Sequence, residues 1–120
     1  MFDARQTKID GPPASELHHP DASELDLPSL LNALSDPVRL EIVRSLACSA
    51  GELPCKAIEL PVSKATASHH FKVLRLAGVI CQHDEGTKRI SGLRRDDLEA
   101  RFPGLLDSVL RAAQQEAALV

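Results

Sequence analysis

The segment SKATASHHFKVLRLAGVI, residues 63–80, constrains the fold of this chain most. Ser63 is a residue type that caps a helix N-terminus, and Gly78 is the type that ends a helix in the left-handed conformation. Between them, Phe71 and Leu74 recur at helical spacing on one face. The segment therefore predicts a short helix with one apolar face and a definite start and stop.

The other face of this predicted helix carries basic and small polar side chains. Lysine can contact guanine or phosphate, serine can contact phosphate or a base edge, and histidine can donate to either. Thr66 can instead turn back toward the cap. An ordinary solvated face would carry similar residues, so the neighbouring segments must decide between the two interpretations. The candidate DNA contacts on this helix are Lys64, Thr66, Ser68, His69, Lys72 and Arg75.

The adjacent histidines His69 and His70 raise the question of a metal site. Adjacent residues on a helix point apart, which makes the pair a poor chelate. His69 falls on the polar face, whereas His70 falls on the apolar side near Leu74. We therefore predict that His70 packs inward, with a ring nitrogen bonded to the backbone.

Two helices are predicted upstream. The leucines of LPSLLNAL, residues 27–34, form a short helical stripe, and apolar residues recur at helical spacing again within PVRLEIVRSL. Ser35 or Asp36 can cap the second of these helices. Pro37 suits its first turn, because the missing N–H of proline needs no partner there.

A third, short helix is predicted for LPCKAIEL, residues 53–60, with Pro54 in its first turn. Cys55 would then lie near a helix N-terminus, where backbone N–H groups and the helix dipole lower the pKa of a thiol. The following PVS reads as a tight turn that leads into the helix beginning after Ser63.

A β-hairpin is predicted for VICQHDEGTKRISGLRR, residues 79–95, because two runs of extended character flank the turn signal DEGT. Lys88 and Arg89 follow that turn, where the tip of a wing beside DNA needs positive charge, so we expect them to anchor phosphates. Arg94 and Arg95 at the end of the hairpin are further candidates for contact with the DNA backbone.

The remaining residues predict a short turn at 96–101 and a last helix from about residue 103. The order is thus α-α-α-α-β-β-α, mainly α with a small β-hairpin. Two short helices joined by a three-residue turn and followed by a hairpin are typical of a winged helix-turn-helix. We expect residues 27–120 to form this DNA-binding and dimerisation domain. Residues 1–26, rich in Pro, Asp, Ser and Glu and carrying His18 and His19, are expected to be a disordered tail.

The distribution of charge supports a surface that meets an anion. The formal net charge of the chain is −3, but residues 56–95 hold eight basic and three acidic groups. Charge asymmetry of this kind indicates one face that meets an anion, so the negative net charge does not argue against a nucleic-acid partner. Three phenylalanines and no tryptophan or tyrosine weaken any function based on stacking against single strands. No apolar run is long enough to span a membrane and the N-terminus does not resemble a signal peptide, so we expect a cytoplasmic protein without membrane association.

Three stretches together resemble the ArsR/SmtB family of bacterial transcriptional repressors: LSDPVRLEIVRSL, SKATASHHFKVLRLAGVI and EGTKRISGLR. The resemblance covers about residues 27–112. It implies a homodimer that binds a palindromic operator in double-stranded DNA and leaves it when an effector binds. Metal-sensing members carry a Cys-x-Cys pair on the third helix or Asp/His pairs on the last helix. In this chain the predicted third helix has only Cys55, and the last helix has neither His nor Cys. We therefore predict no metal site and no cofactor.

The effector hypothesis rests on thiols. Oxidation of Cys55, or a bond between Cys55 and Cys48, would disturb the segment that braces the helix after Ser63 and release DNA. The alternative is a repressor or binding protein for As(III) or a metal that uses Cys48, Cys55 and Cys81, since three thiolates suit such ions. No phosphate loop, nucleophile elbow or paired carboxylates indicate an enzyme. A plain protein-interaction module is a further alternative, which the basic middle segment argues against.

Apolar stripes on the first and last predicted helices indicate self-association. A chain with few aromatic residues could cover these stripes by pairing with a second copy across a two-fold axis, although they could also belong to the core of one chain. The stripe residues are Leu30, Leu31 and Leu34 on the first helix, and Leu105, Leu106, Val109, Leu110 and Ala113 on the last.

Overall fold

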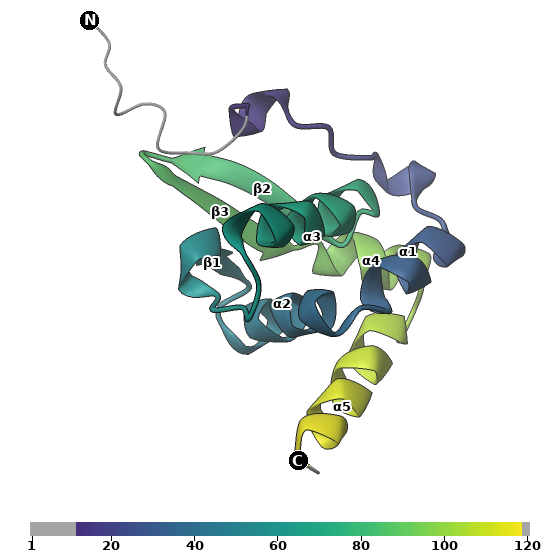
Figure 1. Cartoon of the computed structure of the whole chain (residues 1–120). Helices are drawn as coiled ribbons and strands as arrows, with labels where there is room; N and C mark the ends of the chain where they lie inside the picture. Colours follow the sequence, from purple (N-terminus) through teal and green to yellow (C-terminus); the bar gives the residue numbers. More distant parts are fainter. Residues whose placement is uncertain (1–11, 119–120) are drawn as a thin grey trace, which may run out of the picture.

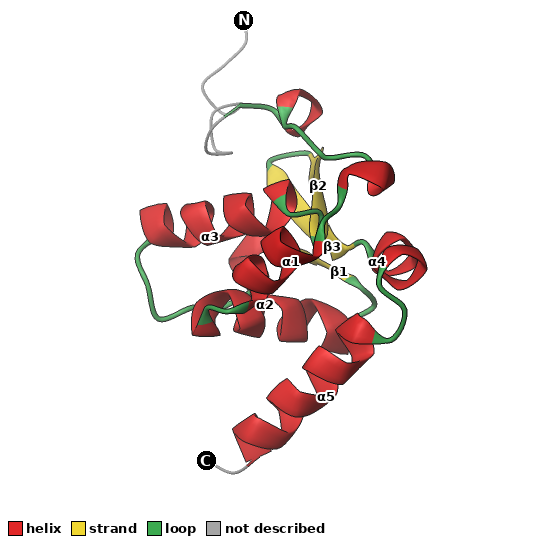
Figure 2. Cartoon of the chain, turned by 90° about the vertical axis from the view of Figure 1, so that its right-hand side faces the viewer, coloured by secondary structure: helices red, strands yellow, loops and turns green. Residues whose placement is uncertain are grey.

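The computed structural model describes residues 12–118, and within them it shows a mainly helical domain with a three-stranded sheet (Figures 1 and 2). The predicted winged helix-turn-helix is confirmed. The α-helices are α1 (Leu27–Leu34), α2 (Pro37–Cys48), α3 (Lys64–Leu76), α4 (Arg95–Arg101) and α5 (Leu105–Ala118). The strands are β1 (Glu52–Pro54), β2 (Ile80–Glu85) and β3 (Lys88–Leu93), and the short 3₁₀ turns are η2 (Ala14–Glu16), η3 (Ala22–Glu24) and η4 (Cys55–Ala57).

The helix starts follow the local sequence. The Asp36 side chain caps α2 by accepting from the backbone N–H of Val38 at 2.8 Å, and Pro37 opens the helix. The predicted hairpin is present: β2 and β3 pair antiparallel from Ile80 opposite Leu93 to Glu85 opposite Lys88, and we call residues 80–93 the wing. The predicted turn at 96–101 is instead the helix α4.

The predicted third helix over residues 53–60 is wrong. Glu52 to Pro54 form the edge strand β1, which pairs antiparallel with β3, and only the single turn η4 follows. The backbone hydrogen bonds of this strand are made with β3, a partner some 40 residues away in the sequence (Leu53 lies opposite Ser91). Local helical spacing could not reveal that pairing.

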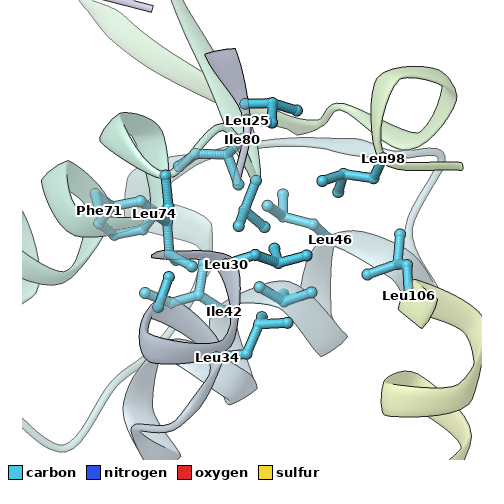
Figure 3. Close-up of a cluster of buried hydrophobic side chains, with 14 of the residues drawn as sticks. Leu25, Leu30, Leu34, Ile42, Leu46, Phe71, Leu74, Ile80, Leu98 and Leu106 are labelled. Carbon is cyan, nitrogen blue, oxygen red and sulfur yellow. The ribbon is translucent and has the colours of Figure 1, made fainter. Parts of the chain in front are cut away.

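The core lies where α1, α2, α3 and the sheet meet (Figure 3). Ile42, Leu46 and Leu74 are fully buried, and Phe71 is nearly so. Leu106 of α5 is also buried against this cluster, while α5 itself extends away from the rest of the domain in both views. The packing fixes the orientation of α3, so its opposite face is left outward.

Residues 12–26 are not the disordered tail that the composition predicted. They run from the tip of the hairpin to α1 and pack on the domain, with Ala14 and Leu25 buried (Figure 1). We call residues 12–26 the N-terminal arm. The domain holds the arm through its backbone: Arg94 Nη1 donates to the carbonyl of Pro20 at 2.8 Å, and Arg101 Nε donates to that of Leu25 at 2.9 Å. The rest of the predicted tail lies outside the described residues.

No helix in the described part of the chain is both long and apolar enough to pass through a membrane.

Candidate nucleic-acid interface

Helix α3 has the predicted cap and stop. Ser63 Oγ accepts from the backbone N–H of Thr66 at 3.2 Å and donates to Thr66 Oγ1 at 3.0 Å. Thr66 is therefore turned toward the cap. Gly78 has φ +83°, and the backbone N–H of Val79 reaches the carbonyl of Leu74 at 3.0 Å. These contacts fix both ends of α3, which stops before the first strand of the wing begins.

His70 packs inward as predicted, but its partner is a side chain. His70 is 8% exposed, and its Nδ1 lies 3.2 Å from Arg39 Nη1. Because a guanidinium only donates, Nδ1 accepts this bond. Arg39 also donates from Nε to the carbonyl of Ala33 at 2.7 Å. Arg39 thus links α1, α2 and α3, a role that the sequence pattern did not indicate.

The outward face of α3 presents most of the predicted DNA contacts to solvent. Lys64, Thr66, Ser68, His69 and Lys72 are all exposed. Their side chains provide the ammonium, hydroxyl and imidazole groups that contact phosphates and base edges in a major groove. We call this set the reading face.

Arg75 does not belong to the reading face, contrary to the prediction. It is 8% exposed, and its Nε and Nη1 donate to the carbonyl of His18 at 3.1 Å and to Gln82 Oε1 at 3.0 Å. Burial and the nearby Arg89 lower the pKa of Arg75. Arg75 stands four residues after Phe71, so the two share a helix face, and that spacing was the signal that could have placed it inward.

The two cationic residues predicted on the wing, Lys88 and Arg89, differ in exposure. Lys88 is exposed next to the turn. Arg89 is turned back: its side chain is 14% exposed, its Nε donates to Asp84 Oδ1 at 3.0 Å, and its Nη2 donates to the carbonyl of Pro12. The hydrogen bond from Arg89 holds the pKa of the Asp84 carboxyl below its ordinary value. Arg89 therefore secures the wing and the N-terminal arm in this structure.

The two arginines that end the hairpin are also paired. Arg94 is 11% exposed on its side chain and bonds Asp97 as well as the Pro20 carbonyl, so it is not placed for a DNA contact. Arg95 is about half exposed and lies 3.6 Å from Asp107. Asp97 lies three residues after Arg94, a spacing at which helical side chains meet. The Pro20 carbonyl and Asp107 could not be read from local spacing, because they depend on how the arm and α5 pack.

The environment of Cys55 differs from the prediction. It lies in η4, with no helix dipole to stabilise a thiolate, and its Sγ is 3.2 Å from Ser91 Oγ and 3.6 Å from Gln82 Nε2. Burial raises the pKa of the thiol. Cys48 is exposed at the end of α2, Cys81 is half-buried in β2, and all three cysteines are free. Within residues 12–118 no group of three or more His, Cys, Asp or Glu side chains is arranged to hold a metal ion.

A cavity of about 910 Å³ adjoins the reading face. Its walls come from α3, the wing, the β1–η4 segment and the N-terminal arm, which contributes Pro12 and Leu17. Lys64, Ser68 and Lys72 of the reading face line one side. The exposed polar face of α3, the wing lysine and this hollow thus form one continuous surface, which we call the candidate interface.

Comparisons with known proteins agree on one class. A protein-family model described as a helix-turn-helix domain matches residues 34–82. YceK, an uncharacterised HTH-type transcriptional regulator of Bacillus subtilis, is 37% identical over 82 residues, which are 67% of this chain and 82% of that protein. An HTH-type transcriptional regulator of Mycobacterium tuberculosis is 41% identical over 71 residues, 57% of this chain and 64% of that protein. The arsenical resistance operon repressor of Staphylococcus xylosus is 37% identical over 76 residues, 62% of this chain and 71% of that protein.

Proposed function

The chain belongs to the ArsR-type family of helix-turn-helix transcriptional regulators, and from this premise we propose that it is a repressor that binds a palindromic DNA operator as a homodimer. In this proposal the reading face of α3 enters the major groove and Lys88 on the wing contacts the backbone. An effector releases the protein from its operator. The function is exercised in the cytoplasm and involves no enzymatic step.

The observation that carries the DNA-binding proposal is the reading face itself. Four polar side chains beyond the cap, Lys64, Ser68, His69 and Lys72, are exposed on a helix whose opposite side is anchored in the core. A helix held in this way can present its side chains to base edges while basic groups contact phosphates. Because α3 and the wing lysine lie on one surface, both can meet the same duplex.

The homodimer is supported by apolar surface at the ends of the domain. Leu27 and Leu31 of α1 are exposed, and α5 projects from the domain with Val109 and Leu110 half-buried. A second copy could cover these residues across a two-fold axis, as the palindromic operator requires. Fewer of the predicted stripe residues are available to a second copy than the sequence predicted, because four of them are already buried within the chain: Leu30, Leu34, Leu106 and Ala113.

The test of the proposed function is a mobility-shift assay with the full chain and DNA from upstream of its own gene. We expect a saturable shift, and the logarithm of the affinity should fall linearly with the logarithm of salt, by about 0.9 for each phosphate contacted. An unrelated duplex of equal length and base composition is the control. Equal affinity for both duplexes, or no shift at low salt, would refute a sequence-specific repressor.

Release by thiol oxidation remains a hypothesis for the effector. The raised pKa of Cys55 and its bonds to Ser91 and Gln82 argue for a slow reaction with peroxide, while Cys48 is exposed and accessible. Operator binding before and after mild diamide treatment, in the wild type and in Cys55→Ser, tests it. Unchanged wild-type binding after treatment would eliminate the thiol switch.

The second candidate is a response to As(III) or a metal through Cys48, Cys55 and Cys81. It is motivated by the Staphylococcus xylosus relative, which is named as an arsenical resistance operon repressor. The three thiols would first have to move together, because they form no cluster in the described structure. Addition of arsenite to the operator complex, in the wild type and in Cys81→Ser, tests this candidate. Release that persists in Cys81→Ser would exclude a three-thiolate site.

A further inference from the structure

Arg75 is a buried arginine whose hydrogen-bond partners in the described part of the chain carry no charge. Its two hydrogen-bond acceptors, the His18 carbonyl and Gln82 Oε1, are both neutral. Among residues 12–118, no carboxylate forms an ion pair with it. A buried charge of this kind costs free energy unless an opposite charge accompanies it. Arg75 is therefore a largely buried cationic residue for which residues 12–118 provide no counter-ion.

Arg75 lines the cavity beside the reading face. The cavity of about 910 Å³ falls within the range of about 300–1,000 Å³ typical of small-molecule sites. Leu17, Pro54 and Phe71 supply apolar walls, and Gln82 stands beside Arg75 as a second polar group. Apolar walls with a few convergent polar groups are the usual composition of a ligand site.

The charges around the opening have the same sign as Arg75. Lys56, Lys72 and Lys88 line the cavity from three different elements, η4, α3 and the wing. All three are exposed, so they contribute to the field at the opening without filling the cavity. The cavity thus attracts an anion and offers it a guanidinium at its buried side.

We propose that this cavity binds a small organic anion with an apolar body, such as an aromatic or medium-chain carboxylate or sulfonate. The acid group pairs with Arg75, and the apolar body lies against Leu17, Pro54 and Phe71. Guanidinium–carboxylate and guanidinium–sulfonate pairs are strong because the hydrogen bonds are charge-assisted. The ligand supplies the counter-ion that residues 12–118 do not provide.

Occupancy of the cavity has a consequence for regulation, which rests on the proposed function. Lys64, Ser68 and Lys72 belong both to the reading face and to the cavity lining. A ligand seated there would place its negative charge and its bulk next to the groups that meet DNA. Operator and ligand would therefore exclude one another, and the ligand would act as the releasing effector.

A DNA phosphate is the other source of an anion at this surface. In the proposed complex the duplex would contact the exposed lysines that line the cavity, whereas Arg75 is only 8% exposed. A rigid backbone phosphate has no apolar body to lie against Leu17 and Phe71. A comparison of an amphipathic anion with inorganic phosphate separates the two sources.

The probe is 8-anilino-1-naphthalenesulfonate, which carries one sulfonate on an aromatic body and fluoresces when bound. It is titrated into the full chain without DNA. We expect saturable binding that Arg75→Gln weakens by about tenfold or more, because a charge-assisted pair is lost. Arg75→Lys keeps the charge and should retain part of the affinity. Ala57→Trp, at an exposed position in the cavity wall, should reduce binding with Arg75 intact.

A control variant and displacement of the dye by other anions test whether binding is specific to the cavity. Arg95→Gln removes an exposed arginine outside the cavity and should leave the affinity for the dye unchanged, with circular dichroism confirming the fold of every variant. Decanoate should displace the dye and inorganic phosphate should not. Equal dye affinity in the wild type, Arg75→Gln and Ala57→Trp would overturn the site, and displacement by phosphate alone would overturn the ligand class.

The regulatory consequence is measured separately. Operator DNA should displace the dye, and decanoate should weaken the operator shift in the wild type but not in Ala57→Trp. A stable complex that holds both operator and dye would overturn the competition. If no operator is bound at all, the proposed function fails, while the dye titration still decides whether the cavity binds anions.

Discussion

Leu25 of the N-terminal arm occupies the space beside Gly78, the residue that ends α3. A Cβ added to Gly78 would lie 2.0 Å from Leu25 Cδ2. Leu25 is almost fully buried, and Arg101 holds its carbonyl at 2.9 Å, so the leucine has little room to withdraw. The glycine thus serves two purposes: its positive φ ends the helix, and its missing side chain lets the arm pack against the domain.

Gly78→Ala should therefore destabilise the protein more than the backbone conformation alone requires. Gly86→Ala is the matched control, because Gly86 also has a positive φ, of +62°, but no atom lies within 4 Å of its added Cβ. We expect Gly78→Ala to lower the free energy of unfolding by about 1–3 kcal/mol more than Gly86→Ala, the usual cost of overpacking. Urea denaturation measures both. Equal losses would show that the Leu25 contact has no cost.

The docking of the arm should depend on pH through His19. Its Nε2 accepts from the backbone N–H of Gln82 at 3.0 Å, and only the neutral ring can do so. Burial and Arg75 lower the pKa of His19, with smaller contributions from Arg94 and His18. The unfolded chain thus binds a proton more readily than the folded one as the pH falls through the ordinary histidine pKa of about 6.5.

We therefore expect the wild type to lose stability relative to His19→Gln between pH 7.5 and 5.5. The other titrating groups are common to both proteins, so their contributions cancel in the comparison. Unfolding in urea at a series of pH values measures the difference. Parallel curves for the two proteins would mean that His19 does not titrate between the folded and unfolded states in this range.

The reading face should contribute to affinity without contributing to the fold. Lys72→Ala and His69→Ala are each expected to weaken operator binding by roughly 1–3 kcal/mol, with Lys72→Ala also reducing the salt slope by about one contact. Arg111→Ala, which removes an exposed cation on α5, outside both the reading face and the hairpin, is the control. Binding that is unchanged in both reading-face variants at matched salt would mean that α3 is not the element that reads DNA.

Self-association should depend on the exposed apolar residues of α1. Leu31 is 47% exposed, so Leu31→Glu can be made without disturbing the core, and two such charges facing each other across a two-fold axis would oppose pairing. We expect a dimer for the wild type and a folded monomer for Leu31→Glu in sedimentation at micromolar concentration. Leu106→Glu should instead unfold the chain, since Leu106 is buried. A wild-type monomer would contradict the proposal.

The starts of α2 and α3 and the end of α3 could be predicted from the sequence, because contacts between residues close in the chain decide them. The cap bonds of Asp36 and Ser63 span two or three residues, and the stop at Gly78 depends on one backbone angle. The hairpin turn is likewise local. The alternation of apolar and polar positions on α3 placed Phe71 and Leu74 inward, and left Ser68, His69 and Lys72 exposed, for the same reason.

Only the tertiary structure decided which arginine side chains are exposed and which are engaged by the N-terminal arm. Arg75, Arg89, Arg94 and Arg101 donate to backbone carbonyls of the arm that lie 57 to 77 positions away in the sequence. An arginine is exposed or buried according to what packs over it, and composition gave no sign that residues 12–26 would do so. The strand β1 in place of a helix, and the buried thiol of Cys55 that follows from it, likewise depend on pairing with the distant β3. Local chemistry set where α2 and α3 begin and where α3 ends, whereas long-range packing determined which charged side chains are exposed to a partner.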